Sequence, residues 1–116
     1  MDKKQVTATL EEIGDMLEIR GENPFKVQAY RKAARIVGAL PQSLEELVES
    51  GELRSVKGIG AALAEKISTL VRTGELPFYE ELKASLPAGL MEMLKIPGLG
   101  PKKVRRIHET LGIESV

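Results

Sequence analysis

The sequence has no cysteine and no tryptophan, and it has one histidine among its 116 residues. Without cysteine the chain has no disulfides, thiolate zinc sites, iron–sulfur clusters or cysteine nucleophile. One histidine is too few for a histidine-rich metal centre. Two Phe and two Tyr are too few for a protein that reads single strands by stacking bases on aromatic side chains. These classes of site and function are therefore excluded.

The chain also lacks a long apolar run and an excess of either charge. No apolar run approaches the ~20 residues that span a bilayer, and the basic N-terminus leads into acidic residues, unlike a secretory signal. The composition, 42% hydrophobic and 29% charged, is that of a globular protein. We expect a monomeric, cytoplasmic protein with no membrane partner. Its 17 basic and 17 acidic residues cancel, which over the whole chain argues against a nucleic-acid partner.

Apolar residues recur with helical spacing along the chain, and no stretch alternates with period two. The first apolar stripe, Val6–Leu17, is followed by Gly21 as a C′ residue. Asn23–Pro24 is typical of an N-cap and a first helical residue, and Ser43–Glu46 has the spacing of a capping box. We therefore predict an all-α fold, a compact bundle of about seven short helices that end near Gly21, Leu40, Gly51, Gly74, Leu86, Leu94 and Gly112.

An internal repeat relates residues 56–67 to residues 96–107 with one offset of 40 residues. Both copies contain a Gly–hydrophobic–Gly turn, at Gly58–Gly60 and at Gly98–Gly100, and Lys66 falls on Arg106. Such a turn allows a tight hairpin between two helices, with the central apolar side chain packed in the core. The repeat predicts two helix-hairpin-helix motifs.

Each turn also opens a helix, so unpaired N–H groups and the positive end of the helix dipole face outward. This arrangement suits a phosphate and requires no particular base. The alternative is that both turns serve only to pack helices together. A dinucleotide-binding fingerprint is excluded, because neither turn follows a strand or has the third glycine.

The zero net charge hides a strong segregation of charge along the chain. Residues 26–40, 54–74 and 95–108 carry net charges of +4, +3 and +5, and acidic segments separate them. Two of these basic blocks contain the glycine turns. The alternative explanation is that these segments are solvent-exposed helix faces with ion pairs along them. It accounts for the acidic segments but poorly for block 95–108, which has no acidic residue. The blocks therefore favour local contacts with the DNA backbone.

The residues Asn23–Ala34, followed by the hairpin of residues 56–67, resemble the amino-terminal lyase domain of family X DNA polymerases. The likeness is to the bacterial and archaeal relatives of DNA polymerase beta and covers nearly the whole chain. It implies an amino-terminal domain over residues 1–78 with the first helix-hairpin-helix, and the start of the next subdomain over residues 79–116 with the second. The metal-binding aspartates of polymerase chemistry belong to a later domain of that family, so we expect a fragment of a longer enzyme.

The resemblance implies that a Na⁺ or K⁺ ion bridges backbone carbonyl oxygens of each hairpin to a phosphate. These carbonyls would belong to Arg54, Val56, Ile59, Leu94, Ile96 and Leu99. The residues expected to contact DNA are Lys26, Arg31, Lys57, Gly58, Gly60, Ala62, Lys66, Gly98, Gly100, Lys102, Lys103 and Arg106. No other cofactor is expected in this chain, and Mg²⁺ would serve only the absent polymerase domain.

The family's amino-terminal domain also removes 5′-deoxyribose phosphate through a Schiff base, and Lys66 aligns with the lysine nucleophile. From the chemistry of the reaction we expect Lys26 and Arg31 to supply supporting positive charge near Lys66, and Tyr30 to orient the sugar or a proton. The sequence departs from lyase-active members at Ala62, where a second lysine is frequent, and at Phe25, where some have histidine. Both departures remove side chains that would hold the 5′-phosphate.

Three functions stay open at this point. The first is sequence-independent binding of gapped or nicked DNA, or of 5′-phosphate ends, as part of a family X polymerase in DNA repair such as base excision repair. The second is a 5′-deoxyribose-phosphate lyase that uses Lys66. The third is a helical protein-interaction domain without a DNA role. The sequence leaves open the preferred DNA structure and whether a polymerase domain follows Val116.

Overall fold

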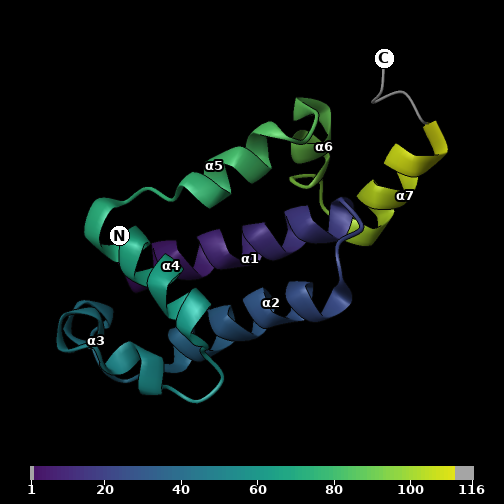
Figure 1. Ribbon diagram of the computed structural model, residues 1–116. Coiled ribbons are helices and arrows are strands. Elements are labelled where there is room, and N and C mark those ends of the chain that lie inside the picture. The colour runs from purple at the N-terminus through teal and green to yellow at the C-terminus, as the bar shows by residue number, and fades with distance from the viewer. Residues whose placement is uncertain (1, 112–116) are drawn as a thin grey trace.

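The computed structural model describes residues 2–111, with the backbone alone for Ala88 and residues 108–111. Over this range the chain forms seven α-helices and one 3₁₀-helix, with no strand, which confirms the predicted all-α fold (Figure 1). The elements are α1 (Lys3–Ile19), α2 (Pro24–Ala39), α3 (Leu44–Ser50), η1 (Glu52–Ser55), α4 (Ala61–Thr73), α5 (Pro77–Ala84), α6 (Ala88–Met93) and α7 (Pro101–Leu111).

The core is built on α1 and α2, the two longest helices, which lie side by side (Figure 1). The apolar stripe expected from the sequence faces this core, since the side chains of Val6, Leu10, Ile13 and Leu17 are at most 2% exposed. In α2 the buried apolar residues again recur with helical spacing, at Val27, Tyr30, Ala34 and Val37. The helical periodicity of the sequence therefore identified the core faces of both helices.

The turn between α1 and α2 follows the expected glycine and proline signals. Gly21 has a φ of +77°, and the Glu22 N–H donates to the Leu17 carbonyl, which together form a Schellman motif at the end of α1. The Asn23 side chain accepts a hydrogen bond from the Phe25 N–H at 2.8 Å, so it caps α2. These bonds satisfy backbone groups at the facing ends of the two helices.

Three local expectations need correction or lie outside the structure. Ser43 precedes α3, but its side chain makes no capping hydrogen bond, so the predicted capping box is not formed. A capping box forms instead at Asp2 with Gln5, at the start of α1. Residues 52–55, which lie between the helix predicted to end near Gly51 and the first glycine turn and for which no helix is predicted, form η1. Gly112, expected to end the last helix, lies outside the described residues.

The two glycine turns lie toward opposite ends of the α1–α2 pair. Elements α3, η1 and α4 gather around the C-terminal half of α2, whereas α7 lies by the C-terminus of α1 (Figure 1). Helix α7 contacts α1, and its Val104 is fully buried. The molecule is elongated, with extents of 48 × 24 × 22 Å. The fold therefore presents the two hairpins at separate places along its length.

Candidate nucleic-acid interface

The first hairpin turn requires glycine at its first position. Gly58 has a φ of +93°, and a Cβ built there would lie 2.4 Å from Cδ1 of Ile36. The next residue, Ile59, is buried in the core. Gly60 then caps α4, with the Ala64 N–H bonded to its carbonyl at 2.9 Å. The turn thus anchors its apolar side chain inward while the backbone of both glycines stays exposed.

The second hairpin repeats the hydrogen bonds of the first. The Ile59 N–H donates to the Val56 carbonyl at 3.1 Å, and at the same offset the Leu99 N–H donates to the Ile96 carbonyl at 3.1 Å. The Val104 N–H bonds the Gly100 carbonyl at 3.0 Å, as Ala64 does to Gly60. Gly98 also has a positive φ, +84°. The repeat seen in the sequence is therefore a repeat of backbone structure.

Both turns lead into helix N-termini that suit an anion. Helix α4 has no side-chain cap on Gly60, and neither α4 nor α7 has an acidic residue in its first turn. The first amides of a helix have no intrahelical partner, and the dipole gives them a partial positive charge. Both helices exceed ten residues, so the partial charge at their ends is well developed. These amides can bind a phosphate without reading a base.

Basic side chains surround the two turns. Lys57 is exposed beside Gly58, and Lys102, Lys103 and Arg106 are exposed on α7. The Lys103 ammonium donates to the Gly98 carbonyl at 3.3 Å, which keeps its charge at the second turn. The exposed positions of these four side chains are compatible with the phosphate contacts expected from the sequence. The contacts themselves stay a prediction.

The sequence reasoning missed Lys32. Its side chain is exposed on α2, and its Cε lies 3.4 Å from where a Cβ on Gly58 would be. A second lysine therefore flanks the first turn from a different helix. A helical projection of α2 shows the exposed face of Lys32, but only the tertiary structure shows that the hairpin packs beside it.

Arg31, a predicted DNA contact, is engaged within the protein. Its Nη2 lies 3.0 Å from Oδ1 of Asp15 and 2.7 Å from Oε1 of Glu18, so it joins α2 to α1. Burial raises the pKa of Asp15 above its ordinary 3.8, although Arg31 acts in the opposite direction. This geometry favours a structural role for Arg31, and its contact with DNA stays a prediction.

The carbonyls predicted to hold a monovalent ion lie in η1, in α6 or its end, and in the two turns. Val56 and Ile96 each accept one turn hydrogen bond through their carbonyl oxygen. A carbonyl oxygen has two lone pairs, so this bond leaves capacity for a cation. Ile96 is half exposed, which leaves the second turn open to solvent. The donor set fits a hard monovalent cation, and the ion stays a prediction.

A second cluster brings together the residues that the sequence linked to lyase chemistry. Lys26 and Tyr30 come from α2 and Lys66 from α4, and all three meet Phe78 at the start of α5. The Tyr30 and Phe78 rings are stacked, with centroids 6.0 Å apart and planes inclined by 11°. The ammonium nitrogens of Lys66 and Lys26 lie 5.1 Å and 5.9 Å from the Phe78 centroid. Burial raises the pKa of Tyr30, so its phenol stays protonated near neutral pH.

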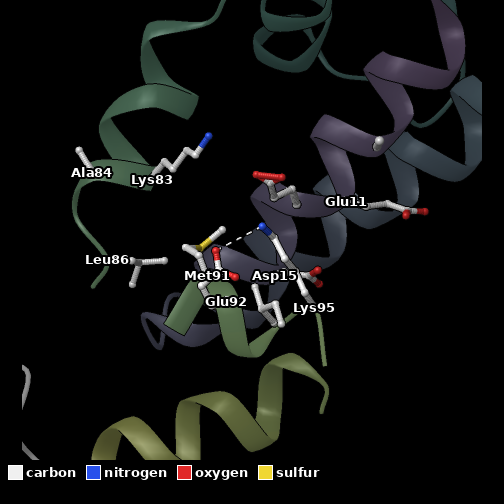
Figure 2. Close-up of a pocket in the computed structure, with 11 residues that line it drawn as sticks. Glu11, Asp15, Lys83, Ala84, Leu86, Met91, Glu92 and Lys95 are labelled. Carbon is white, nitrogen blue, oxygen red and sulfur yellow. Dashed lines mark hydrogen bonds and ion pairs between the residues drawn. The ribbon is translucent and has the colours of Figure 1, made fainter. Parts of the chain in front are cut away.

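A cavity of about 730 Å³ lies away from these clusters, between α1, α5 and α6 (Figure 2). Four acidic side chains and two lysines line this cavity. The acidic residues are Glu11, Glu12, Asp15 and Glu92. One of the two lysines, Lys95, pairs with Glu92 at 3.4 Å (Figure 2). The Tyr79 hydroxyl donates to the Glu12 carboxylate, and burial followed by this bond raises the pKa of Tyr79. Carboxylates repel phosphate, so this cavity is not the nucleic-acid interface.

Comparison with known proteins identifies the family. Residues 1–76 match the helix-hairpin-helix domain family, and residues 90–116 match the SAM-like helix-hairpin-helix tandem family. The chain belongs to the helix-hairpin-helix family. It is also 39% identical, over 113 residues and 97% of its length, to the DNA polymerase/3'-5' exonuclease PolX of Bacillus subtilis (strain 168). These matches confirm the resemblance drawn from the sequence.

The helix-hairpin-helix chain spans only 19% of the length of that relative. Its two matched regions each contain one of the glycine turns described above. Within residues 2–111, no helix has the length and apolar character needed to cross a membrane. Among the residues whose side chains the structure describes, 2–87 and 89–107, no cluster of acidic and histidine side chains could hold a metal ion.

Proposed function

We propose that this chain binds the sugar–phosphate backbone of DNA without reading its sequence, as the DNA-anchoring part of a family X polymerase. The observation that carries the proposal is the paired hairpin. The two turns have the same backbone hydrogen bonds, and each leads into a helix, α4 or α7, with no acidic residue in its first turn. Exposed lysines lie beside both turns. The name of the Bacillus subtilis relative, a DNA polymerase, supports the same assignment.

The separation of the hairpins favours DNA with an interruption, as at a gap or a nick. The first turn packs beside Ile36 in α2, whereas Arg105 of α7 lies beside Gly21, just before α2 begins. From Pro24 to Ile36 the helix rises about 18 Å. The two hairpins therefore hold backbone segments several nucleotides apart, which suits the two sides of a gap. An interrupted duplex bends at lower cost than an intact one, so we expect it to contact both sites more readily.

The test is equilibrium binding of gapped, nicked and intact duplexes of two unrelated sequences, followed by fluorescence anisotropy. We expect tighter binding of the interrupted duplexes and equal affinity for both sequences. Lys102→Ala should weaken binding and reduce the slope of log affinity against log salt by about 1, because one phosphate contact is lost. Lys83→Ala is the matched control, since Lys83 lines the acidic cavity rather than a hairpin.

The proposal fails if the wild-type chain binds none of the duplexes, a result that would favour a protein-interaction domain. It also fails if affinity depends strongly on the base sequence. If Lys102→Ala and Lys83→Ala change the DNA affinity equally, the second hairpin does not contact DNA. Lys57→Ala then tests the first hairpin in the same assay.

A second candidate function, 5′-deoxyribose-phosphate lyase, is supported by the lysine–aromatic cluster. Lys66 is half-buried, and its ammonium lies on the same ring as that of Lys26. In this reaction the Lys66 amine would add to the C1′ aldehyde with loss of water. Loss of a C2′ proton from the resulting imine then breaks the bond between C3′ and its phosphate oxygen.

Borohydride trapping on incised abasic DNA tests the lyase, because borohydride reduces the imine to a stable amine. We expect a covalent adduct with the wild-type chain and none with Lys66→Ala. Lys66→Arg keeps the positive charge but cannot form an imine, so it should bind the DNA and give no adduct. Lys83→Ala should be trapped like the wild type. An adduct that survives both changes at Lys66 would refute the assignment.

A further inference from the structure

The acidic cavity between α1, α5 and α6 takes no part in the proposed DNA binding. Its lining residues on α1 lie across from those on α5, and α6 closes one end (Figure 2). A volume of about 730 Å³ is in the range of pockets that hold a ligand. The cavity is therefore large enough to receive several side chains of a partner.

Both lysines that line the acidic cavity are engaged within the protein. The Lys95 ammonium pairs with Glu92 at 3.4 Å, and the Lys83 ammonium lies 5.3 Å from the centroid of the Tyr79 ring. The negative face of an aromatic ring attracts such a cation. The two lysines therefore have partners on α5 and α6 rather than on α1.

Two carboxylates of α1 that line the cavity form no ion pair. Among the side chains of residues 2–87 and 89–107, no basic group pairs with Glu11 or Glu12. Glu12 accepts a hydrogen bond from the Tyr79 hydroxyl, which is a neutral donor. Glu11 and Glu12 therefore present negative charge that no cation of the described chain balances.

The carboxylates of α1 also have the spacing of a helix turn. Glu11 and Asp15 are four residues apart, which is about 6 Å along the axis of α1. Arg31 pairs with Oδ1 of Asp15, and the second oxygen of the carboxylate can accept another donor. Lysine or arginine side chains four residues apart on another helix have the same spacing. A helix that lies along α1 therefore matches both carboxylates with its cations.

Apolar side chains line the acidic cavity beside these carboxylates. Leu86 is buried, and Met91 and Leu94 are half-buried. The flexible thioether of methionine adapts to the shape of an apolar partner. An amphipathic helix in a groove buries its apolar face, and its charged flank meets complementary charges. The lining thus suits a helix that is apolar on one face and basic beside it.

The charge of the cavity argues against two other classes of partner. Carboxylates repel both nucleic acid and the anionic headgroups of a membrane. A second copy of this chain would offer the basic helix α7, but Val104 of α7 is already fully buried in its own fold. The complementary partner is therefore a different protein with a basic helix.

We propose that the acidic cavity is a docking site for a basic amphipathic helix of a protein partner. The cations of that helix lie against Glu11 and Asp15, and its apolar face contacts Met91 and Leu94. The inference goes beyond the proposed DNA binding and does not depend on it.

The experiment measures the binding of three fluorescein-labelled peptides to the 116-residue chain by fluorescence anisotropy, without DNA. The first peptide has about eighteen residues of alanine, leucine and lysine, with leucines at i, i+3, i+4 and i+7 and lysines along one flank. The second has the same composition in scrambled order, and the third has glutamate in place of lysine. We expect the first to bind at least about tenfold more tightly than either of the others, because only it combines the apolar face with matching cations.

Two variants place a positive charge in the cavity from opposite walls. Glu11→Arg should weaken binding of the first peptide about tenfold, because an attraction becomes a repulsion. Ala84→Arg, at the exposed end of α5, should weaken it as well by adding bulk and positive charge. Glu45→Arg is the matched control, since it makes the same charge change on α3, outside the cavity, and should leave the affinity within about twofold. Circular dichroism checks that each variant keeps its helices.

A first peptide that binds no more tightly than the scrambled one would overturn the inference. Equal weakening by Glu11→Arg and Glu45→Arg would also overturn it, because the attraction would then be unspecific. Self-association of the wild type in sedimentation, abolished by Glu11→Arg, would assign the cavity to a second copy instead. Because the assay contains no DNA, each of these failures leaves the proposed DNA binding untouched.

Discussion

Replacing Gly58 by alanine should destabilise the protein more than the same change at the equivalent glycine of the second hairpin. The φ of +93° lies where an L-residue costs about 1–2 kcal/mol. The new Cβ would also lie 2.4 Å from Cδ1 of Ile36. Moving the end of that side chain off its rotamer costs about 0.5–1.5 kcal/mol. The expected loss in the free energy of unfolding is therefore about 2–3 kcal/mol.

The other turn glycines provide matched comparisons. Gly98 has a φ of +84°, but a Cβ there meets nothing within 4 Å. Gly98→Ala should therefore cost only the backbone term, about 1–2 kcal/mol. Gly60 has a φ of −80° and open space around its Cα, so Gly60→Ala should cost less than about 1 kcal/mol through the weaker helix cap.

Urea unfolding followed by circular dichroism measures the three costs on one scale. The expected order of destabilisation is Gly60→Ala, then Gly98→Ala, then Gly58→Ala as the largest. A Gly58→Ala protein as stable as the wild type would refute the reasoning, because both the positive φ and the contact with Ile36 would then be free of cost. A larger cost at Gly98 than at Gly58 would refute the assigned role of Ile36.

Three further changes test the core and its charges. Arg31→Met removes both ion pairs and leaves Asp15 and Glu18 without their cation, so the free energy of unfolding should fall by about 1–2 kcal/mol in urea titrations. Burial raises the pKa of Asp15 in the folded state above 3.8. The contribution of Asp15 to the free energy of unfolding is therefore fully present below pH 3.8 and is lost as the pH rises through the raised pKa. Asp15→Asn should lack this decline when unfolding is measured across that interval, and an unchanged pH profile would contradict the assignment. Val104→Ala opens a cavity under α7 and should cost about 1–3 kcal/mol, with faster hydrogen exchange in α7 than in α1.

The sequence alone predicted those parts of the fold that depend on local chemistry. Gly21 and Asn23 mark the α1–α2 turn because a positive φ and an N-cap each demand particular residue types. The repeat predicted two equivalent turns, and Ile59 and Leu99 make the same backbone bond. Ser43 shows the limit of such signals, because the capping spacing is present but its exposed side chain forms no cap.

The missed features depend on contacts between distant segments. Counting charges treated Arg31 as available to DNA, but it pairs with carboxylates 13 and 16 residues earlier in the chain. Phe78 belongs to no sequence motif, and its ring meets the Lys66 ammonium only because the turn after α4 places α5 beside that residue. Lys32 likewise gains its position from the packing of the hairpin on α2. The local sequence pattern does not predict contacts between such distant residues, because they depend on how the helices pack in three dimensions.

The salt dependence of DNA affinity tests the central claim most directly. If two hairpins each bind about two phosphates, the logarithm of affinity should fall linearly with the logarithm of salt concentration, with a slope of about −3 to −4. Gapped duplexes of two unrelated sequences should give the same slope and the same affinity. An affinity for gapped DNA that does not change between low and high salt would contradict the account.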